Sequence, residues 1–358
     1  MIWLRAEVAA TLDAGVHGVR DALQVAIKLE HSTIPPYLYA LYSLKPGSNS
    51  KIAKIISSIL TEEMLHMALV CNVLNAIDGS PDIGEPHFIP NYPGPLPGGV
   101  EKNLVVNLAP FSLPVVTGTF MVIEEPEKKL DFPILPHPCT LDLAAFPIDK
   151  RPITIGDFYR KIMKKIRALG SSIFTGDPSR QLKTVFGKVP LFAVTDENSA
   201  EQAIMLVVRQ GEGTKTSPLD DEGNPAHFYR FAEIYKRFTL IPNPNPRPGS
   251  PPYVFGGDPV PFDPKGVWPV ILNPHTSTYI PGSAADQGNR DFNRMYTRML
   301  RNLHAAFNGE PDRIAIAVAD MGKLRRQGQY LMSLKVQHGH AGPSFEYDPD
   351  TNWTEAER

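Results

Sequence analysis

The sequence predicts a mainly α-helical protein built on a four-helix bundle, with a long crossover between the two helix pairs. Apolar residues recur at helical spacing in several long stretches, and a turn-forming segment separates the first two of them. A proline-rich segment then precedes two further helical stretches near the C-terminal end. We expect one elaborated domain over residues 1–358, with a bundle core at 16–240, a Pro-rich strap at 241–283, and C-terminal helices and tail at 284–358.

The composition excludes some classes of function. The chain has 36 Lys and Arg against 38 Asp and Glu and no long basic run, so we expect no nucleic-acid partner. An apolar stretch at the N-terminus is interrupted by Glu7, Thr11 and Asp13, so it predicts neither a signal peptide nor a membrane span. The only cysteines, Cys71 and Cys139, are too few for a disulfide framework. A cytoplasmic location without membrane contact fits these features best.

The first two helices should form an antiparallel hairpin. The apolar pattern predicts a long helix over 16–44 that is interrupted and bent near Pro35 and Pro36, since proline lacks the amide donor that a helix needs. After a turn at 45–50, a second helix follows and stops near Asp78 and Gly79. This turn is short enough to bring the two helices side by side.

The rest of the chain alternates helices with irregular connections. A crossover rich in Pro and Gly begins at Ser80, contains a short helix over 113–125 and extends to about Pro152. We expect the third helix over 154–169, the fourth over 198–210, and a short amphipathic helix over 227–238. Eleven prolines between Pro242 and Pro274 predict a segment without regular structure that lies across the domain surface.

Three residues of the hairpin are candidate metal ligands. Glu63 and His66 form a Glu-x-x-His motif, whose spacing places both side chains on one helical face. Glu30 lies 17 residues before Gly47 in the turn and Glu63 lies 16 residues after it, so the two carboxylates should face one another. A bound dication would offset the cost of burying them, whereas an inter-helix ion-pair network is the alternative. Their chain neighbours His31 and Glu62 suit supporting or solvent-facing roles.

A second half of the site would need carboxylates and a histidine from the other helices. Asp157 lies in the first turn of the third helix, where a carboxylate favoured by the helix dipole is an equal explanation. Glu212 ends the fourth helix, an unfavourable place for an anion, and His227 begins the next helix. We expect Glu212 and His227 together to replace a continuous Glu-x-x-His motif. The reserve candidates are Glu124, Glu201 and Glu233.

With these residues placed, the sequence resembles the ferritin-like domain family that includes the iminophenyl-pyruvate dimer synthase of bisindole pigment pathways. The resemblance extends over almost the whole chain and rests on 29–31 with 34–37, 62–66, 110–112, 123–126, 154–159, 210–213, 227–231 and 342–347. It implies a ferritin-like bundle and metal ligation by Glu30, Glu63, His66, Glu212 and His227. Two departures are that Asp157 stands where relatives have glutamate and that this chain is much shorter than the pigment synthase.

These features favour a di-metal carboxylate protein that oxidises or couples a small, amino-acid-derived molecule. Glu and His ligands suit two iron ions, with manganese or zinc as alternatives, and an open coordination position would admit dioxygen. A metal-free or structural binding module of a biosynthetic cluster is the alternative, and iron storage is a less favoured one because the crossover and strap would cover cage surfaces. We expect a small-molecule substrate; the sequence is compatible with a homo-oligomer.

Overall fold

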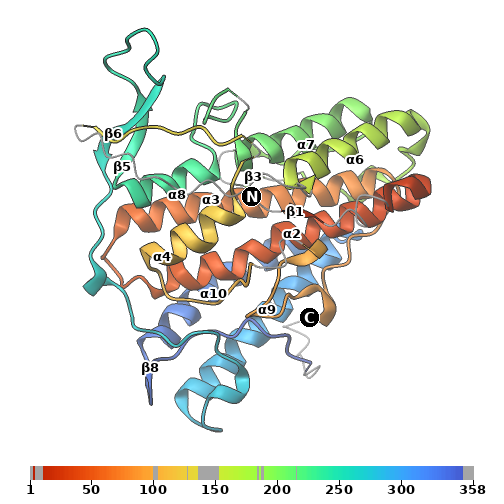
Figure 1. Cartoon of the computed structure of the whole chain (residues 1–358). Coiled ribbons are helices and arrows are strands. Elements are labelled where there is room, and N and C mark those ends of the chain that lie inside the picture. The colour runs from red at the N-terminus through yellow and green to blue at the C-terminus, as the bar shows by residue number, and fades with distance from the viewer. Residues whose placement is uncertain are drawn as a thin grey trace.

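Three layers of helices make up the computed structural model (Figure 1), which describes residues 3–4, 11–99, 104–126, 128–135, 153–183, 185–186, 189–214 and 216–349. The middle layer is the hairpin of α2 and α3, with α6 and α7 packed on one side of it and α9 and α10 on the other. These helices span Gly15–Ser43 (α2), Ser50–Ala76 (α3), Ile155–Leu169 (α6), Glu197–Glu212 (α7), Ala284–Phe307 (α9) and Arg313–Ser333 (α10). The predicted four-helix bundle is therefore α2, α3, α6 and α7.

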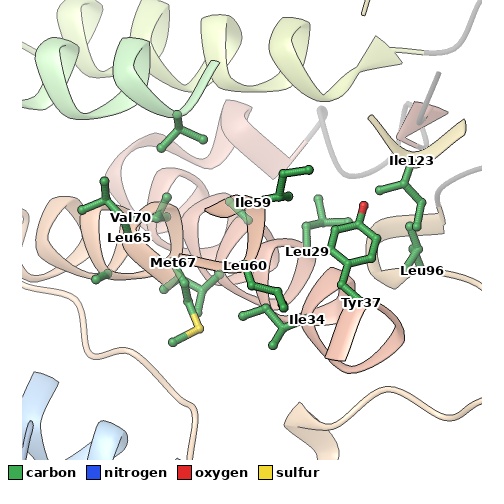
Figure 2. Close-up of a cluster of buried hydrophobic side chains, with 14 of the residues drawn as sticks. Leu29, Ile34, Tyr37, Ile59, Leu60, Leu65, Met67, Val70, Leu96 and Ile123 are labelled. Carbon is green, nitrogen blue, oxygen red and sulfur yellow. The ribbon is translucent and has the colours of Figure 1, made fainter. Parts of the chain in front are cut away.

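Helices α2 and α3 carry apolar residues on most of their sides, because other helices pack against both faces of the hairpin that they form. Most residues of α2 and α3 are buried, as is expected for helices inside a larger protein rather than at its surface. In Figure 2, Leu29, Tyr37, Leu96 and Ile123 gather on one side of this hairpin. The turn that connects the helices uses left-handed backbone at Gly47 (φ 79°), which glycine adopts without steric cost.

The predicted interruption of the first helix at its two prolines is wrong, because α2 continues through them. Pro36 cannot donate the amide hydrogen bond that the carbonyl of Ser32 would normally accept four residues earlier. The Tyr92 hydroxyl donates to that carbonyl at 2.6 Å instead. A side chain from the crossover therefore satisfies a backbone acceptor that proline leaves open in a buried helix.

The crossover places a short helical segment against the bundle. After two turns of 3-10 helix at Pro86–Phe88 (η2) and Pro97–Gly99 (η3), the chain forms α4 (Leu113–Val115), the π-helical η4 (Val116–Phe120) and α5 (Met121–Ile123). This segment packs against α8 (His227–Lys236). Glu124 follows directly at its C-terminal end. Residues 100–103, 127 and 136–152 of the expected crossover, including Cys139, lie outside the described residues, whereas Cys71 is buried in α3.

The second helix pair follows the predicted boundaries closely. Short elements connect α6 to α7: η5 (Ser171–Ile173), η6 (Pro178–Arg180), β3 (Val185–Phe186) and β4 (Val189–Pro190). Asp196 caps α7, since its side chain accepts a hydrogen bond from the backbone of Ser199, whose hydroxyl in turn accepts from the Asp196 amide. The loop from 213 to 226 then leads into α8, whose first residue is His227.

The proline-rich segment is more regular than the sequence predicts. An antiparallel pair forms from β5 (Phe238–Pro242) and β6 (Tyr253–Pro259). The prolines of β6 are confined to its last position and to the residues that precede it, so 253–258 can supply a normal hydrogen-bonding ladder. Beyond the pair, the Trp268 amide donates to the Ser43 carbonyl at 2.7 Å and so ties the strap to the end of α2.

Small elements complete the described chain. They are β1 (Trp3–Leu4) paired with β2 (Ile153–Thr154), η1 (Thr11–Ala14), η7 (Pro264–Gly266), η8 (Thr276–Thr278), and β7 (Lys335–Val336) paired with β8 (Gly339–His340). Within the described residues, no helix combines the length and the apolar character needed to cross a bilayer.

We predict that Tyr92→Phe lowers the free energy of unfolding by about 1–3 kcal/mol, because the buried Ser32 carbonyl loses its donor and cannot bond to proline. Denaturant unfolding of the purified variant measures the loss. Tyr330→Phe is the matched control, since Tyr330 is 49% exposed. Equal stability of the two variants would show that the Tyr92 hydroxyl is not needed.

Candidate metal centre

A first group of potential ligands joins the two helices of the middle layer. Glu30 lies on α2, while Glu63 and His66 lie one turn apart on α3. One ligand atom from each of the three buried side chains lies within 4.8 Å of the others. His66 Nδ1 is 3.4 Å from Glu30 Oε2. The structure thus brings together the three residues that the hairpin geometry predicts.

A second group shares Glu63 with the first and adds residues from two other elements. Glu124 directly follows α5 in the crossover, and His227 is the first residue of α8. His227 Nδ1 lies 2.8 Å from Glu63 Oε1 and 3.4 Å from Glu124 Oε2. Glu63 therefore belongs to both groups.

In each of the three glutamates, one carboxylate oxygen accepts a hydrogen bond from a side-chain hydroxyl. Tyr159 donates to Glu30 Oε1 at 2.5 Å, Thr33 donates to Glu63 Oε2 at 2.9 Å, and Tyr37 donates to Glu124 Oε1 at 2.5 Å. In every case the other oxygen is the one that approaches a histidine Nδ1. The hydroxyls therefore orient the carboxylates so that their remaining oxygens converge.

Both histidines are oriented through their outer nitrogens as well. His66 Nε2 lies 3.0 Å from Gln210 Oε1, and His227 Nε2 lies 2.9 Å from Glu62 Oε2. Arg230 binds both oxygens of Glu62, at 2.9 and 2.6 Å, and so fixes that carboxylate. This arrangement leaves each Nδ1 facing inward, as a histidine does when a carbonyl or carboxylate holds its other nitrogen.

The buried charges perturb one another strongly. Burial, with the charge of Glu124 next, raises the pKa of the Glu63 carboxyl to about 7. Burial opposes protonation of His227, but Glu124, Glu62 and Glu63 raise its pKa well above the ordinary value. Burial also raises the pKa of Glu62 in part, yet its contacts with His227 and Arg230 lower it to about 2. Without another cation, Glu63 and His227 therefore hold protons near neutral pH more readily than free side chains do.

A small cavity of about 50 Å³ adjoins the groups, and Glu212 lines it together with Glu30, Glu63 and Glu124. Glu212 Oε1 accepts a hydrogen bond from the Gly156 amide at 2.9 Å, at the start of α6. A Cβ atom at position 156 would lie 2.6 Å from the Glu212 carboxylate, so glycine is required there for this contact. Glu212 thus faces the site from α7 but belongs to neither ligand group.

Asp157 is also absent from both groups among the described residues, contrary to its expected role. Its carboxylate accepts a hydrogen bond from Arg160 at 2.8 Å. Tyr159, two residues further along α6, faces Glu30 instead. Residues two apart in a helix point about 200° away from one another, so Asp157 and Tyr159 cannot both face the site.

The expected pairing of Glu212 with His227 is replaced by one between Glu124 and His227. Glu124 was only a reserve candidate. It follows a short helix after a long crossover, and the sequence does not indicate against which helices the end of that short helix packs. The other reserve residues lie elsewhere: Glu201 pairs with Arg167, and Glu233 accepts from the Leu240 amide at 2.8 Å. His31 bonds the Tyr296 hydroxyl at 2.8 Å, away from the groups.

Sequence reasoning missed the side chains that hold the ligands. Tyr37, Tyr159 and Gln210 lie within segments already noted for their resemblance to known proteins, but their contacts depend on the packing of different helices. Tyr37 is the one that spacing could have indicated, because it lies seven residues after Glu30 and therefore on the same face of α2.

The fold and the two groups define a helical-bundle protein with a carboxylate and histidine cluster between its helix pairs. A family model described as Ferritin-like matches residues 23–236, and the chain belongs to this family. A solved structure of a ferritin-like protein from Caulobacter vibrioides is similar over 92% of this chain and 97% of that one, with a TM-score of 0.58 and 23% identity. That likeness concerns the fold. No curated protein matches the chain.

We predict that Glu233→Gln changes the pH dependence of stability. Burial raises the pKa of Glu233 to about 7. The folded protein therefore holds a proton that the unfolded chain loses near pH 4.5, and stability falls as the pH rises from about 4.5 to about 7, by up to about 3 kcal/mol. The variant should lose this decline in denaturant unfolding at several pH values. Glu201→Gln is the control, and an unchanged decline in Glu233→Gln would contradict the assignment.

Proposed function

We propose that the protein binds two transition-metal ions, with iron as the expected metal, between Glu30, Glu63, His66, Glu124 and His227, and uses them in oxidative chemistry on a small organic molecule. The proposal follows from the geometry of the two ligand groups, which share Glu63. A bridging carboxylate between two groups that each contain a histidine is the arrangement of di-metal sites in helical bundles.

One nitrogen atom carries the proposal. His227 is fully buried, and its Nδ1 has no hydrogen-bond partner among the described residues, although two carboxylate oxygens approach it. Because Glu62 holds the opposite nitrogen, the ring cannot turn away without losing that contact. A cation shared by Nδ1 and the two carboxylates would satisfy all three atoms at once.

The donor set fits such ions in chemistry and in charge. Carboxylate oxygens and imidazole nitrogens suit iron, manganese or zinc rather than the soft metals that favour sulfur. Three carboxylates and two neutral histidines carry three negative charges, which two divalent ions would more than balance. The retained protons described above would then be released, because each ligand binds a metal in its deprotonated form.

Iron bound at such a site supplies redox chemistry toward dioxygen and organic substrates. The residues of the chain prepare the surroundings for it. Tyr159, Thr33 and Tyr37 hold the outer oxygens of the three carboxylates, and burial raises the pKa of both tyrosines, so they remain neutral donors. Apolar side chains from four helices and one loop line the adjoining cavity and limit access of water: Leu29, Leu96, Ile123, Ile155, Val207 and Val208.

An amino-acid-derived molecule is the substrate class that the sequence resemblance to the iminophenyl-pyruvate dimer synthase family favours, with dioxygen as the oxidant. The cavity of about 50 Å³ is smaller than such a molecule. A second cavity of about 250 Å³ shares Val208 and Glu212 with it and includes the cationic side chains of Lys128, Arg160 and Arg209. Glu212 therefore lies between the ligand groups and the larger space that a carboxylate-bearing substrate would enter.

We predict that the purified protein, reconstituted anaerobically with iron(II), binds two ions per chain. His66→Ala and His227→Ala should each retain about one ion, because each removes the only histidine of one group. Glu63→Ala should lose more than either, since both groups contain Glu63. Elemental analysis of folded protein measures the content.

His275→Ala is the matched control for these variants, because His275 is half exposed and pairs with Glu346 far from the groups. Helical content by circular dichroism confirms that each variant folds. If wild type binds no iron, manganese or zinc, the metal-free binding module becomes the better interpretation of the site. If His227→Ala keeps the full metal content, the second group is wrong.

We predict that the iron-loaded protein consumes dioxygen faster when a suitable substrate is present. A panel of aromatic amino acids and their 2-oxo acids, followed with an oxygen electrode and by product analysis, tests this proposal. Turnover should disappear in Glu63→Ala and persist in His275→Ala. Oxidation and retention of many iron ions per chain, independent of any organic substrate, would instead indicate iron storage.

A further inference from the structure

A third cavity, separate from the ligand groups and from the two cavities lined by Glu212, lies between the middle helix layer and the C-terminal helices. Its volume is about 180 Å³, and its lining is mainly apolar. The walls come from α2, α3, α9 and α10, whereas α6, α7 and α8 contribute nothing to it. In Figure 1, α9 and α10 lie on the side of the α2 and α3 hairpin opposite to α6 and α7. Because α9 and α10 line the cavity, it faces away from the candidate metal centre.

The cavity wall follows the helical repeat. His31, Ile34 and Leu38 line it from α2 at intervals of three and four residues, and Leu60, Met64 and Met67 do so from α3. In Figure 2, Ile34, Leu60 and Met67 extend to the same side of the hairpin, toward the C-terminal helices. Four methionines contribute to the wall, two from α3 and one each from α9 and α10. Their flexible side chains suit a site that adapts to its ligand.

One residue of this lining, His31, has a buried polar atom without a hydrogen-bond partner among the described residues. His31 lines the cavity, its residue is 2% exposed, and its Nδ1 has no hydrogen-bond partner among the described residues. The other nitrogen is occupied, because the Tyr296 hydroxyl lies 2.8 Å from Nε2. Whichever nitrogen carries the proton, a hydroxyl group can complement Nδ1, since a hydroxyl both donates and accepts.

Some residues of the cavity lining are buried, whereas others lie at the protein surface. His31 and Tyr296 are each 2% exposed, whereas Ser57 is half-buried and Arg325 is exposed. A ligand would thus enter between α3 and α10 near Ser57 and Arg325 and reach His31 at the buried end. A dry apolar cavity of about 150 Å³ is sufficient to hold benzene. The present cavity therefore suits one substituted six-membered ring.

We propose that this cavity is a binding site for a small apolar molecule that carries a hydroxyl group, such as a monocyclic phenol, with the hydroxyl bonded to His31 Nδ1. The apolar body would displace no charged group, because the buried part of the wall contains none. This site does not depend on the metal centre: its wall and its polar atom belong to the opposite face of the hairpin.

The pair p-cresol and toluene tests the proposal, because the two molecules differ only in the hydroxyl. Isothermal titration calorimetry on the full-length protein should show saturable binding of one p-cresol per chain. Toluene should bind roughly five- to tenfold more weakly, as is typical for the loss of one neutral hydrogen bond. His31→Phe should reduce p-cresol to the affinity of toluene. Equal affinities of the two compounds in wild type would overturn the role of His31.

A space-filling substitution tests the location. Ala68 lines the cavity and is 1% exposed, so Ala68→Leu should weaken p-cresol binding more than tenfold. Ala53→Leu, on the same helix but outside this lining, is the matched control and should bind normally. Unchanged binding in Ala68→Leu, or no saturable binding to wild type up to the solubility of p-cresol, would overturn the proposal.

NMR of the methionine methyl groups tests the location of the binding site in the wild-type protein, without any substitution. Addition of p-cresol should shift the methyl signals of Met67 and Met299, which line the cavity, and leave Met163 on α6 unchanged. Shifts confined to methionines outside the lining would contradict the proposed location even if binding were measured.

Discussion

The structure depends on the burial of three carboxylates in the interior of a helical bundle. Glu30, Glu63 and Glu124 cannot be placed there without partners, because unpaired charges in an apolar interior are destabilising. Each therefore has a hydroxyl on one oxygen and an imidazole near the other. These contacts connect α2, α3, α6, α8 and the crossover, so the same polar cluster determines how five parts of the chain pack against one another.

Much of the fold could be predicted because apolar periodicity reports directly on helices. The hairpin, the second helix pair and the two C-terminal helices all follow from that pattern. Pro35 and Pro36 misled the prediction, since the donor that replaces the missing amide of Pro36, Tyr92, lies far along the chain. The β5 and β6 pair was missed for a related reason, since a count of prolines does not show that they cluster at the ends of a strand.

The candidate site was predictable only where its residues share one local geometry. Glu30, Glu63 and His66 belong to a single hairpin, so their distances from the turn were enough to align them. Glu124 comes after an irregular crossover, and its position relative to His227 depends on tertiary packing that no local pattern encodes. The expected role of Asp157 is wrong because α6 presents Tyr159 to the site, and the helical spacing of Phe158, Ile162 and Ile166 already places Asp157 on the opposite, polar side of that helix.

Neighbouring residues of the α2 and α3 hairpin face different sites, with the ligand groups on one side of the hairpin and the apolar cavity on the other. Glu30 faces the ligand groups while His31 faces the apolar cavity, and Glu63 and Met64 divide in the same way. Each residue added to or removed from a helix rotates all later residues of that helix by about 100°. A single insertion within α2 before Glu30, or within α3 before Glu63, would therefore turn that glutamate toward the apolar cavity and remove it from the ligand groups. By this geometry, a change in length at the turn or in the flanking loops preserves both sites, whereas one inside either helix does not.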